Sequence, residues 1–284
     1  KAGCCMRGIK EITSKDNAIF KLIKSLKVRK HRIREALFVV EGPKQVVEAE
    51  TSRYDLKYLV VRQDRLGYLK DYDLFDRVDR YACTVISMDE RLFKQISDTE
   101  NNQGILAVLS YEPLSEKDFM MEVPSGSNVL VLDKLQDPGN IGTIIRTAEG
   151  AGFKGIILLK GSGDVFSPKS IRAAGGATLR MPVTMINDAA ALRRLSCEFS
   201  KRLIVSDVES GLAYYDVDLS ENIFLVMGNE GHGVSKEILD MADIRINIPT
   251  DGALESLNVA TAGAVLMMDS LRQSKNKIRR GKRC

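Results

Sequence analysis

The chain has 284 residues, more than one typical domain, and its hydrophobic content of 44% is enough to form two packed cores. No apolar run approaches the roughly 20 residues that a membrane-spanning helix needs. The first ten residues also lack the apolar segment of a secretory signal. These features exclude an integral membrane protein, and we expect a two-domain protein of the cytoplasm without a membrane partner.

The cysteine and histidine content argues against disulfides and metal sites. Five cysteines form an odd set without CxxC spacing, and only two histidines are present. Neither a disulfide framework nor a zinc site follows from such a set. We therefore expect reduced thiols and no bound metal. The cysteines are Cys4, Cys5, Cys83, Cys197 and Cys284.

Positive charge is concentrated in two segments, although the net charge is only +4. Residues 21–34 hold seven Lys and Arg, and residues 272–283 hold seven more; the remaining 28 cations face 38 acids. Such gathered charge is typical of proteins that bind a polyanion, above all nucleic acid, because phosphate contacts release counterions. A solvated helix face and a frayed tail are the alternative. The predicted RNA contacts of the first segment are Lys24, Lys27, Arg29, Lys30, Arg32 and Arg34.

The first half of the chain alternates helices and strands. Apolar residues at helical spacing predict a helix over 16–30, with Ser14 as its cap. Further helices are expected at 43–50 and 89–96. Apolar runs rich in β-branched residues predict strands at 36–42, 56–61, 84–87 and 104–110. We interpret residues 11–110 as a small α/β domain that binds the RNA substrate.

A linker and a second domain follow. Prolines and glycine among charged residues predict a linker over 111–127. Apolar strands separated by helices then favour a parallel sheet covered on both faces, in a domain over 128–274 with a basic tail at 275–284. The predicted strands are 128–133, 155–160, 202–206, 223–227 and 244–248. The predicted helices are 140–151, 168–175, 188–200, 235–241 and 257–274.

Three polar or glycine-rich segments come directly after strands of this sheet. They cover residues 133–148, 227–233 and 248–259. Parallel sheets place their ligand sites at the carboxyl edge, so these segments should meet in space. Known nucleotide loops do not match, because GxxxxGK and the complete dinucleotide fingerprint are absent. Spacing alone predicts an α/β enzyme with a polar site that acts on RNA.

Each of these segments also has a plain structural interpretation. Arg146 could pair with Glu149 on the same helix, and Ser256 could simply cap the last helix. Glycines at 228, 231 and 233 could form an ordinary turn, in which His232 is a solvated side chain.

Together the three segments resemble the signature motifs of the SpoU (TrmH-like) family of RNA ribose 2′-O-methyltransferases, within the SPOUT superfamily. The resemblance covers residues 128–272, and residues 11–110 look like the ribosomal-protein-like substrate-binding domain that precedes it in ribosomal RNA enzymes. It implies an α/β fold with a parallel sheet and a deep trefoil knot that binds S-adenosylmethionine. It also implies a homodimer in which the site is completed across the interface.

The resemblance also assigns roles to single residues. Arg146 corresponds to the catalytic arginine, which the family uses as the proposed base, although stabilisation of charge suits a guanidinium better. The other polar positions of the motifs are Asn140, Glu230, Ser256 and Asn258. The positions whose backbone holds the cofactor are Gly228, Ile248 and Leu257.

The predicted function is therefore methylation of a ribose 2′-hydroxyl in RNA. Ribosomal RNA is favoured because a separate domain with a basic helix suits folded RNA. A transfer RNA 2′-O-methyltransferase is the alternative substrate class, and a non-catalytic RNA-binding or ribosome assembly factor is the alternative function class. Housekeeping modification and methylation of an antibiotic site both fit this resemblance.

Overall fold

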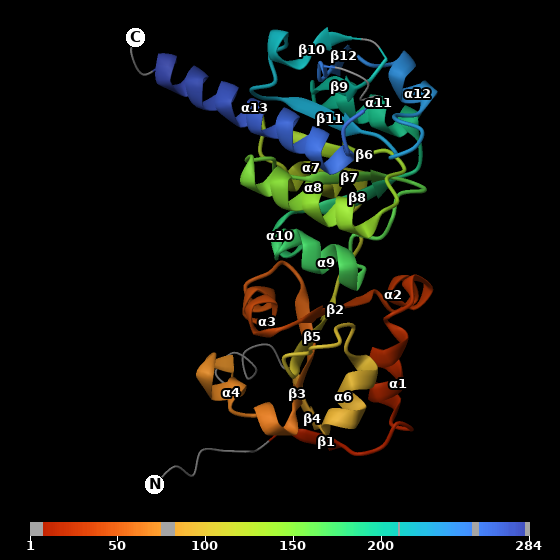
Figure 1. The fold of residues 1–284 in the computed structure, drawn as a ribbon, viewed down its shortest axis with the longest axis vertical. Helices are drawn as coiled ribbons and strands as arrows, with labels where there is room; N and C mark the ends of the chain where they lie inside the picture. The colour runs from red at the N-terminus through yellow and green to blue at the C-terminus, as the bar shows by residue number, and fades with distance from the viewer. Residues whose placement is uncertain (1–7, 75–82, 210, 252–255, 282–284) are drawn as a thin grey trace. The chain divides into compact units, whose positions relative to one another are not determined.

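The chain folds into two compact units in the computed structural model, which describes residues 8–74, 83–209, 211–251 and 256–281 (Figure 1). The first unit comprises Lys1–Glu112 together with Phe166–Arg172, and the second comprises Pro113–Val165 and Ala173–Cys284. Cys4, Cys5, Cys284, residues 252–255 of the third motif and residues 282–284 of the predicted tail lie outside the described residues.

The first unit contains a five-stranded mixed sheet in the order β1-β4-β3-β5-β2. The neighbouring strands β1, β4 and β3 run parallel, whereas β5 pairs antiparallel with both β3 and β2. The strands are β1 (Lys10–Ile12), β2 (Leu37–Glu41), β3 (Asp55–Arg62), β4 (Thr84–Met88) and β5 (Ile105–Ser110). The helices are α1 (Ala18–Ser25), α2 (Arg29–Glu35), α3 (Pro43–Glu50), η1 (Gln63–Arg65), α4 (Tyr68–Asp71) and α6 (Glu90–Ile96).

Helices α1 and α6 cover one face of this sheet. Phe20 and Phe93 are fully buried against the strand residues Val60 and Ile86. The predicted helix over 16–30 is in fact two helices, because Val28 has extended backbone angles and breaks it. The N-cap of α1 is Asn17, whose Oδ1 accepts a hydrogen bond from Ile19 N at 2.9 Å, and not the predicted Ser14.

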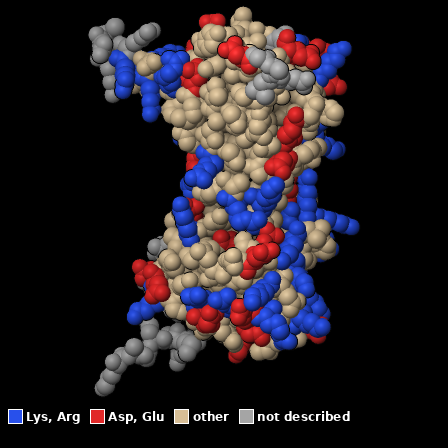
Figure 2. All heavy atoms as spheres, viewed as in Figure 1, with Lys and Arg blue, Asp and Glu red and all other residues tan. Residues whose placement is uncertain are grey.

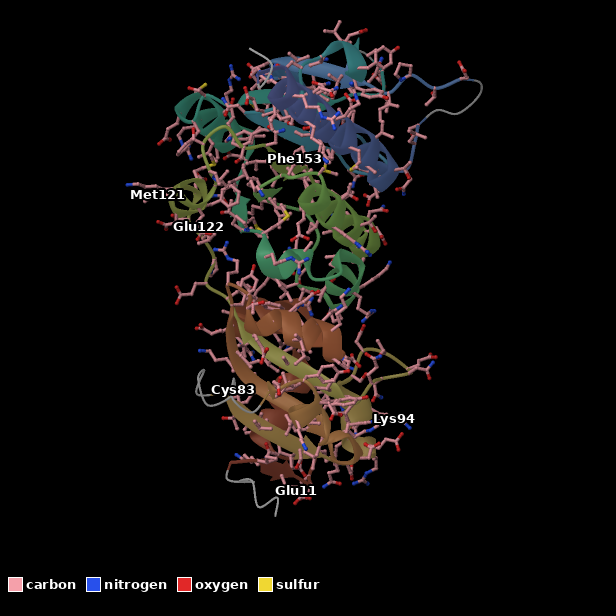
Figure 3. All side chains as sticks on the ribbon, turned by 90° about the vertical axis from the view of Figure 1, so that its left-hand side faces the viewer. Glu11, Cys83, Lys94, Met121, Glu122 and Phe153 are labelled. Atoms are coloured by element: carbon pink, nitrogen blue, oxygen red, sulfur yellow. The ribbon has the colours of Figure 1, made fainter. Side chains whose placement is uncertain are left out.

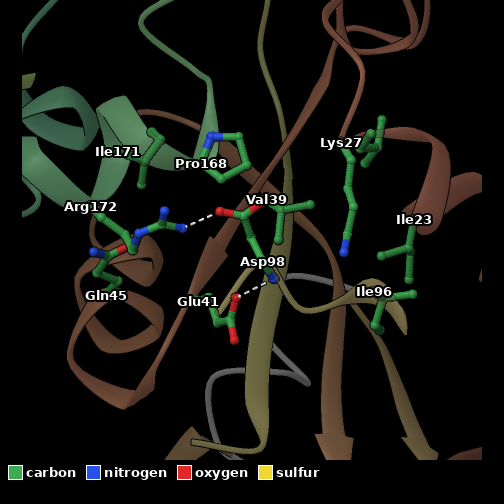
Figure 4. Close-up of a pocket in the computed structure, with 11 residues that line it drawn as sticks. Ile23, Lys27, Val39, Glu41, Gln45, Ile96, Asp98, Pro168, Ile171 and Arg172 are labelled. Atoms are coloured by element: carbon green, nitrogen blue, oxygen red, sulfur yellow. Dashed lines mark hydrogen bonds and ion pairs between the residues drawn. The ribbon is translucent and has the colours of Figure 1, made fainter. Parts of the chain in front are cut away.

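The first unit also includes a short segment from the second half of the sequence. The ring of Phe166 stacks on Phe38 and Tyr111, with centroid distances of 4.7 and 4.5 Å. A few residues further on, Arg172 forms an ion pair of 2.5 Å with Asp98 (Figure 4). No pattern in the sequence predicts that residues 166–172 belong here.

The second unit contains a seven-stranded sheet in the order β10-β12-β9-β11-β6-β7-β8. All of its neighbouring strands pair in parallel, which confirms the predicted parallel sheet. The strands are β6 (Val129–Leu132), β7 (Ile156–Leu159), β8 (Val183–Ile186), β9 (Arg202–Ser206), β10 (Leu212–Ala213), β11 (Ile223–Met227) and β12 (Ile244–Asn247). Strands β8 and β10 at the two edges were not predicted; β8 has four residues and β10 only two.

Helices cover both faces of this sheet. Phe119, Leu192 and Ile238, from α7, α11 and α12, pack in one core with strand residues such as Val131 and Val205. Helices α8 and α13 lie together over the other face (Figure 1). The helices of this unit are α7 (Glu116–Glu122), α8 (Pro138–Gly150), α10 (Ala177–Arg180), α11 (Ala189–Glu198), η2 (Tyr214–Asp216), α12 (Lys236–Asp240) and α13 (Val259–Gly281). Helix α9 (Pro168–Ala174) lies mostly in the segment Phe166–Arg172, which belongs to the first unit.

Two of these helices differ from the sequence prediction. Helix α7 lies inside the predicted linker over 111–127. Its Phe119 is buried, whereas Met121 is 73% exposed and points outward (Figure 3). Helix α13 continues to Gly281, so the described part of the predicted basic tail is helical. Within the described residues no helix combines the length and apolar character needed to cross a bilayer. The trefoil knot stays a prediction.

Candidate active site

The first motif forms the start of α8 at the carboxyl end of β6. Pro138 occupies the first turn, where its missing N–H costs no hydrogen bond. Asp137 is the N-cap, and its Oδ1 accepts from Asn140 N at 2.9 Å. The helix therefore begins two residues before the predicted start, with Asn140 in its first turn.

The second motif is a tight loop after β11. Asn229 and Gly233 exchange backbone hydrogen bonds of 2.8 and 2.9 Å, which folds the loop back on itself. A Cβ at Gly228 would lie 2.2 Å from the carbonyl carbon of Gly233, so no side chain fits there. Asn229 was not among the predicted site residues, yet its Oδ1 accepts from the backbone N–H groups of Gly231 and His232. Asparagine between glycines is typical of such turns, and that is the signal that could have found it.

Glu230 links this loop to the first motif. Its carboxylate accepts hydrogen bonds from Asp137 N at 3.0 Å, Gln136 N at 3.3 Å and Asn140 Nδ2 at 3.2 Å. Partial burial raises the pKa of Glu230, but the hydrogen bonds from these donors outweigh it and leave the pKa below the ordinary value. Glu230 is therefore a charged acceptor that orients the amide of Asn140.

Asn258 connects the third motif to the same cluster. Its Nδ2 donates to Asn140 Oδ1 at 3.3 Å, while its own Oδ1 accepts from Ala260 N at 2.9 Å and Thr261 N at 3.3 Å. Asn258, and not Ser256, is therefore the cap of α13. Glu230, Asn140 and Asn258 form one chain of hydrogen bonds, so the three motifs meet as the sequence predicted.

Arg146 has no ion pair or hydrogen bond among the described residues. The sequence allowed a pair with Glu149, but the Glu149 carboxylate binds the guanidinium of Arg180 through two contacts, of 2.5 and 2.8 Å. The exposed guanidinium of Arg146 instead lies beside Gly175, 3.5 Å from the position that a Cβ would occupy there. The charge of Arg146 is therefore available to a ligand.

The structure does not bring Arg146 to the hydrogen-bonded cluster within one chain. Six residues separate Asn140 from Arg146, so the two side chains project about 120° apart around the axis of α8. Ser256 is exposed and also makes no hydrogen bond to the cluster among the described residues. His232 is exposed, as expected if it is a solvated side chain of an ordinary glycine turn.

The predicted cofactor positions lie in the loops at the same sheet edge. Gly228 follows β11, Ile248 follows β12, and Leu257 precedes Asn258. Beside Ile248, the Oδ1 atom of Asn247 is buried and has no hydrogen-bond partner among the described residues. Buried acceptors are rarely left unpaired, so this atom is a place for a ligand donor.

The cations of the first unit that were predicted to contact RNA differ in how far they are exposed and in whether the protein already binds them. Arg32 is only 4% exposed, and its guanidinium donates to Leu26 O at 2.6 Å, so it stabilises the turn between α1 and α2. Lys27 Nζ donates to Ser97 O at 2.5 Å, and Lys24 Nζ donates to Gln95. Lys30 is exposed and has no partner among the described residues. Arg29 and Arg34 are also exposed.

A pocket of the first unit is not the candidate active site. It has an apolar floor, and Lys27, Glu41 and Arg172 are among its polar lining residues (Figure 4). Lys27 is the only predicted site residue in its lining. Among the described residues, no three His, Cys, Asp or Glu side chains gather as metal ligands would.

Comparisons with known proteins agree on a family. Residues 127–268 match the SpoU rRNA Methylase family, and residues 17–107 match the MRM3-like substrate binding domain. The 23S rRNA (guanosine(2553)-2′-O)-methyltransferase RlmP of Bacillus subtilis is 33% identical over 91% of this chain and 98% of its own length.

Two further proteins show the same likeness. The 23S rRNA (guanosine-2′-O-)-methyltransferase RlmB of Haemophilus ducreyi is 29% identical over 70% of this chain and 83% of its own length. A solved structure of an AdoMet-bound rRNA methyltransferase from Sinorhizobium meliloti is 29% identical, with a TM-score of 0.82 over 93% of this chain and 98% of that one. The chain thus belongs to the SpoU rRNA methylase family, and it joins a methylase domain of that family to a substrate-binding domain.

Proposed function

We propose that this protein transfers a methyl group from S-adenosylmethionine to a ribose 2′-hydroxyl of ribosomal RNA. The observation that carries the proposal is the hydrogen-bonded chain of Glu230, Asn140 and Asn258, which joins all three motifs, together with an arginine free of any protein partner among the described residues. The names of RlmP and RlmB support ribosomal RNA as the substrate and the 2′-oxygen as the acceptor.

The residues at the sheet edge fit S-adenosylmethionine. Adenosine offers N–H and O–H donors, and the buried Oδ1 of Asn247 is an acceptor without a protein donor among the described residues. The backbone groups of Gly228, Ile248 and Leu257 would hold the cofactor, and the Sinorhizobium meliloti relative was solved with AdoMet bound. When bound, the cofactor supplies a methyl group already activated on a sulfonium sulfur.

The protein then needs to position the ribose, stabilise charge on the 2′-oxygen and let the 2′-hydroxyl proton pass to an acceptor such as an RNA phosphate oxygen or water. A guanidinium is a poor base, so the side chain of Arg146 is suited to stabilise negative charge on the attacking oxygen or to hold the adjacent phosphate. Glu230 fixes the amide of Asn140, and Asn258 fixes it from the other side. These three are positioning groups, which favour a reactive geometry.

The protein acts as a homodimer of the cytoplasm in this proposal. Arg146 projects away from Asn140 on α8, and an arginine supplied by the partner protomer would complete each site. Met268 on α13 is 51% exposed, which suits a face that a second copy covers. In the first unit, Arg29, Lys30 and Arg34 are the exposed cations that we assign to RNA phosphates.

The test is methylation of unmodified RNA with radiolabelled S-adenosylmethionine, followed by alkaline hydrolysis. Methylation of the 2′-oxygen blocks cleavage of the next bond, so the expected product is labelled, alkali-resistant dinucleotides from ribosomal RNA. Label in transfer RNA would change the substrate class. Cofactor binding without label in naked RNA, in assembly intermediates or in ribosomal subunits would favour a non-catalytic RNA-binding factor and contradict the proposal.

A further inference from the structure

The two halves of α13 are built differently. In the first half, Leu266, Met267 and Ser270 are buried against the second unit. From Lys275 to Arg279 every side chain is exposed, including the apolar Ile278, which is 60% exposed. Helices in proteins owe most of their stability to packing, so an unpacked end needs another explanation.

Contacts with the loop before β11 hold the helix up to this point. Gln273 Nε2 donates to Val217 O at 3.0 Å, and its Oε1 accepts from Leu219 N at 2.8 Å. Ser274 Oγ donates to Ser220 O. Beyond these residues the helix projects from the second unit, and this projecting part is covered with Lys and Arg side chains (Figures 1 and 2).

The cations whose side chains the structure describes at this end fall into two groups. Lys277 pairs with Glu221 at 2.5 Å and faces the body of the unit. Lys275 and Arg279 have no partner among the described residues and lie four positions apart, on the same face as Arg272 one turn earlier. Like charges at this spacing destabilise a helix. The helix dipole favours cations only in the last turn, which accounts for Arg279 but not for Lys275.

We propose that Arg272, Lys275 and Arg279 form a phosphate-binding face for the RNA substrate. The inference rests on the proposed function and adds a second contact region to it. Lys275 and Arg279 are exposed, and no acid among the described residues neutralises them. Such cations suit the RNA backbone, because phosphate contacts release counterions. Arg272 now pairs with Asp269 at 2.7 Å and would share its charge with the RNA.

The position of this face limits the kind of RNA that it serves. Helix α13 begins beside Asn258, and Arg279 is 21 residues further on, which corresponds to about 30 Å at the rise of an α-helix. One nucleotide cannot reach both places. The substrate is therefore an RNA that extends beyond the methylated nucleotide and contacts the protein again about 30 Å away.

The test compares the double variant K275Q/R279Q with the wild-type chain in filter binding of an unmodified 23S rRNA transcript. Affinity is measured between about 0.05 and 0.3 M KCl, because each phosphate contact contributes about 0.7 to 0.9 to the salt slope. Loss of two contacts should lower the slope by about 1.4 to 1.8 and the affinity at 0.1 M roughly 25- to 60-fold. In methylation assays KM should rise while kcat at saturating RNA stays unchanged.

The single variant K277Q is the matched control, since it removes one charge from the same helix, at a lysine that pairs with Glu221. It should change affinity far less than K275Q or R279Q alone. Unchanged affinity in K275Q/R279Q, an equal loss in K277Q, or an altered oligomeric state with RNA binding intact would each overturn the inference. Cofactor binding and methylation by the wild-type chain test the proposed function separately, so failure there is distinguishable from failure here.

Discussion

The carboxyl edge of the seven-stranded sheet and the basic helices α1 and α2 use their charged groups in opposite ways. At the sheet edge the uncharged amides and Glu230 satisfy one another, while Arg146, further along α8, is left without a protein partner among the described residues. In α1, α2 and the turn between them the cations are numerous, yet Arg32 and Lys27 are committed to backbone carbonyls of the protein. The number of charges in a segment therefore does not measure the charge that a ligand can use.

Replacing the free arginine of α8 should have the largest effect. Arg146→Ala is expected to lower methylation roughly 10²- to 10⁴-fold, the range for loss of a group that assists proton transfer or stabilises charge in the transition state. S-adenosylmethionine binding, followed by calorimetry, should be unchanged. Arg180→Ala is the control, because Arg180 pairs with Glu149, and it should retain most of the activity. Full turnover in Arg146→Ala would remove this residue from the mechanism.

Replacing the buried arginine of α2 should affect stability instead. Arg32→Met removes the hydrogen bond to Leu26 O and is expected to destabilise the first unit by about 1–3 kcal/mol. The measurement is the midpoint of thermal unfolding. Arg34→Met removes the same charge from an exposed side chain of α2 and should leave the midpoint nearly unchanged. If the two variants unfold alike, Arg32 does not have the structural role assigned here.

Changing the glutamate of the second motif tests whether its charge is used. Glu230→Gln replaces an acceptor oxygen with a donor, so it cannot accept from both Asp137 N and Gln136 N as before. We expect kcat/KM to fall roughly tenfold, as for loss of one or two hydrogen bonds to a charged group. Unaltered kcat/KM would mean that Asn140 is oriented without Glu230.

The same carboxylate predicts a pH dependence. Because the pKa of Glu230 is lowered in the folded state, its stabilising contribution is present above the unfolded pKa and is lost as pH falls through the folded pKa. Stability of the wild-type chain should therefore drop more steeply than that of Glu230→Gln below the ordinary titration range of glutamate. Parallel stability curves for the two proteins in acid would contradict this assignment.

The smallest effect is expected for an exposed lysine of α2. Lys30→Gln should lower the affinity for a 23S rRNA transcript about five- to eightfold at 0.1 M salt and reduce the salt slope by about 0.7 to 0.9, the contribution of one phosphate contact. Thermal stability should not change, because Lys30 makes no contact to lose among the described residues. Lys21→Gln, which removes a lysine that pairs with Asp16, is the control. If Lys30→Gln lowered the stability but not the RNA affinity, Lys30 would have a structural role like that of Arg32 and would not contact phosphate.

The sequence predicted much of the candidate site because its geometry follows from local rules. Apolar strands with helices between them require parallel pairing, and parallel strands bring the loops of Asn140, Glu230 and Asn258 to one edge. The partners of single charges do not follow from local rules. Glu149 binds Arg180, which is 31 residues away and belongs to a four-residue helix with no sequence signal.

The same limit explains where the predictions of the fold were wrong or incomplete. Residue type alone places Arg32 at the surface, although a short turn between two helices buries it beside Leu26 O. Phe166 lies in a short segment without periodic pattern, and contacts with rings distant in the sequence, those of Phe38, Tyr54 and Tyr111, explain its membership of the first unit. Edge strands as short as β10 leave no periodic pattern to detect.

The all-parallel sheet of the second unit also has a consequence for the rate of folding. Parallel neighbours cannot be joined by a tight hairpin, so each pairing waits for a crossover or for distant segments to meet. Next to the central pair β6 and β11, Asn128 and Ile223 are hydrogen-bonded although they are 95 residues apart. Chains dominated by such distant contacts fold slowly and expose unpaired strands meanwhile. We expect the second unit to form late in refolding and to be the part of the nascent chain that most needs protection from aggregation.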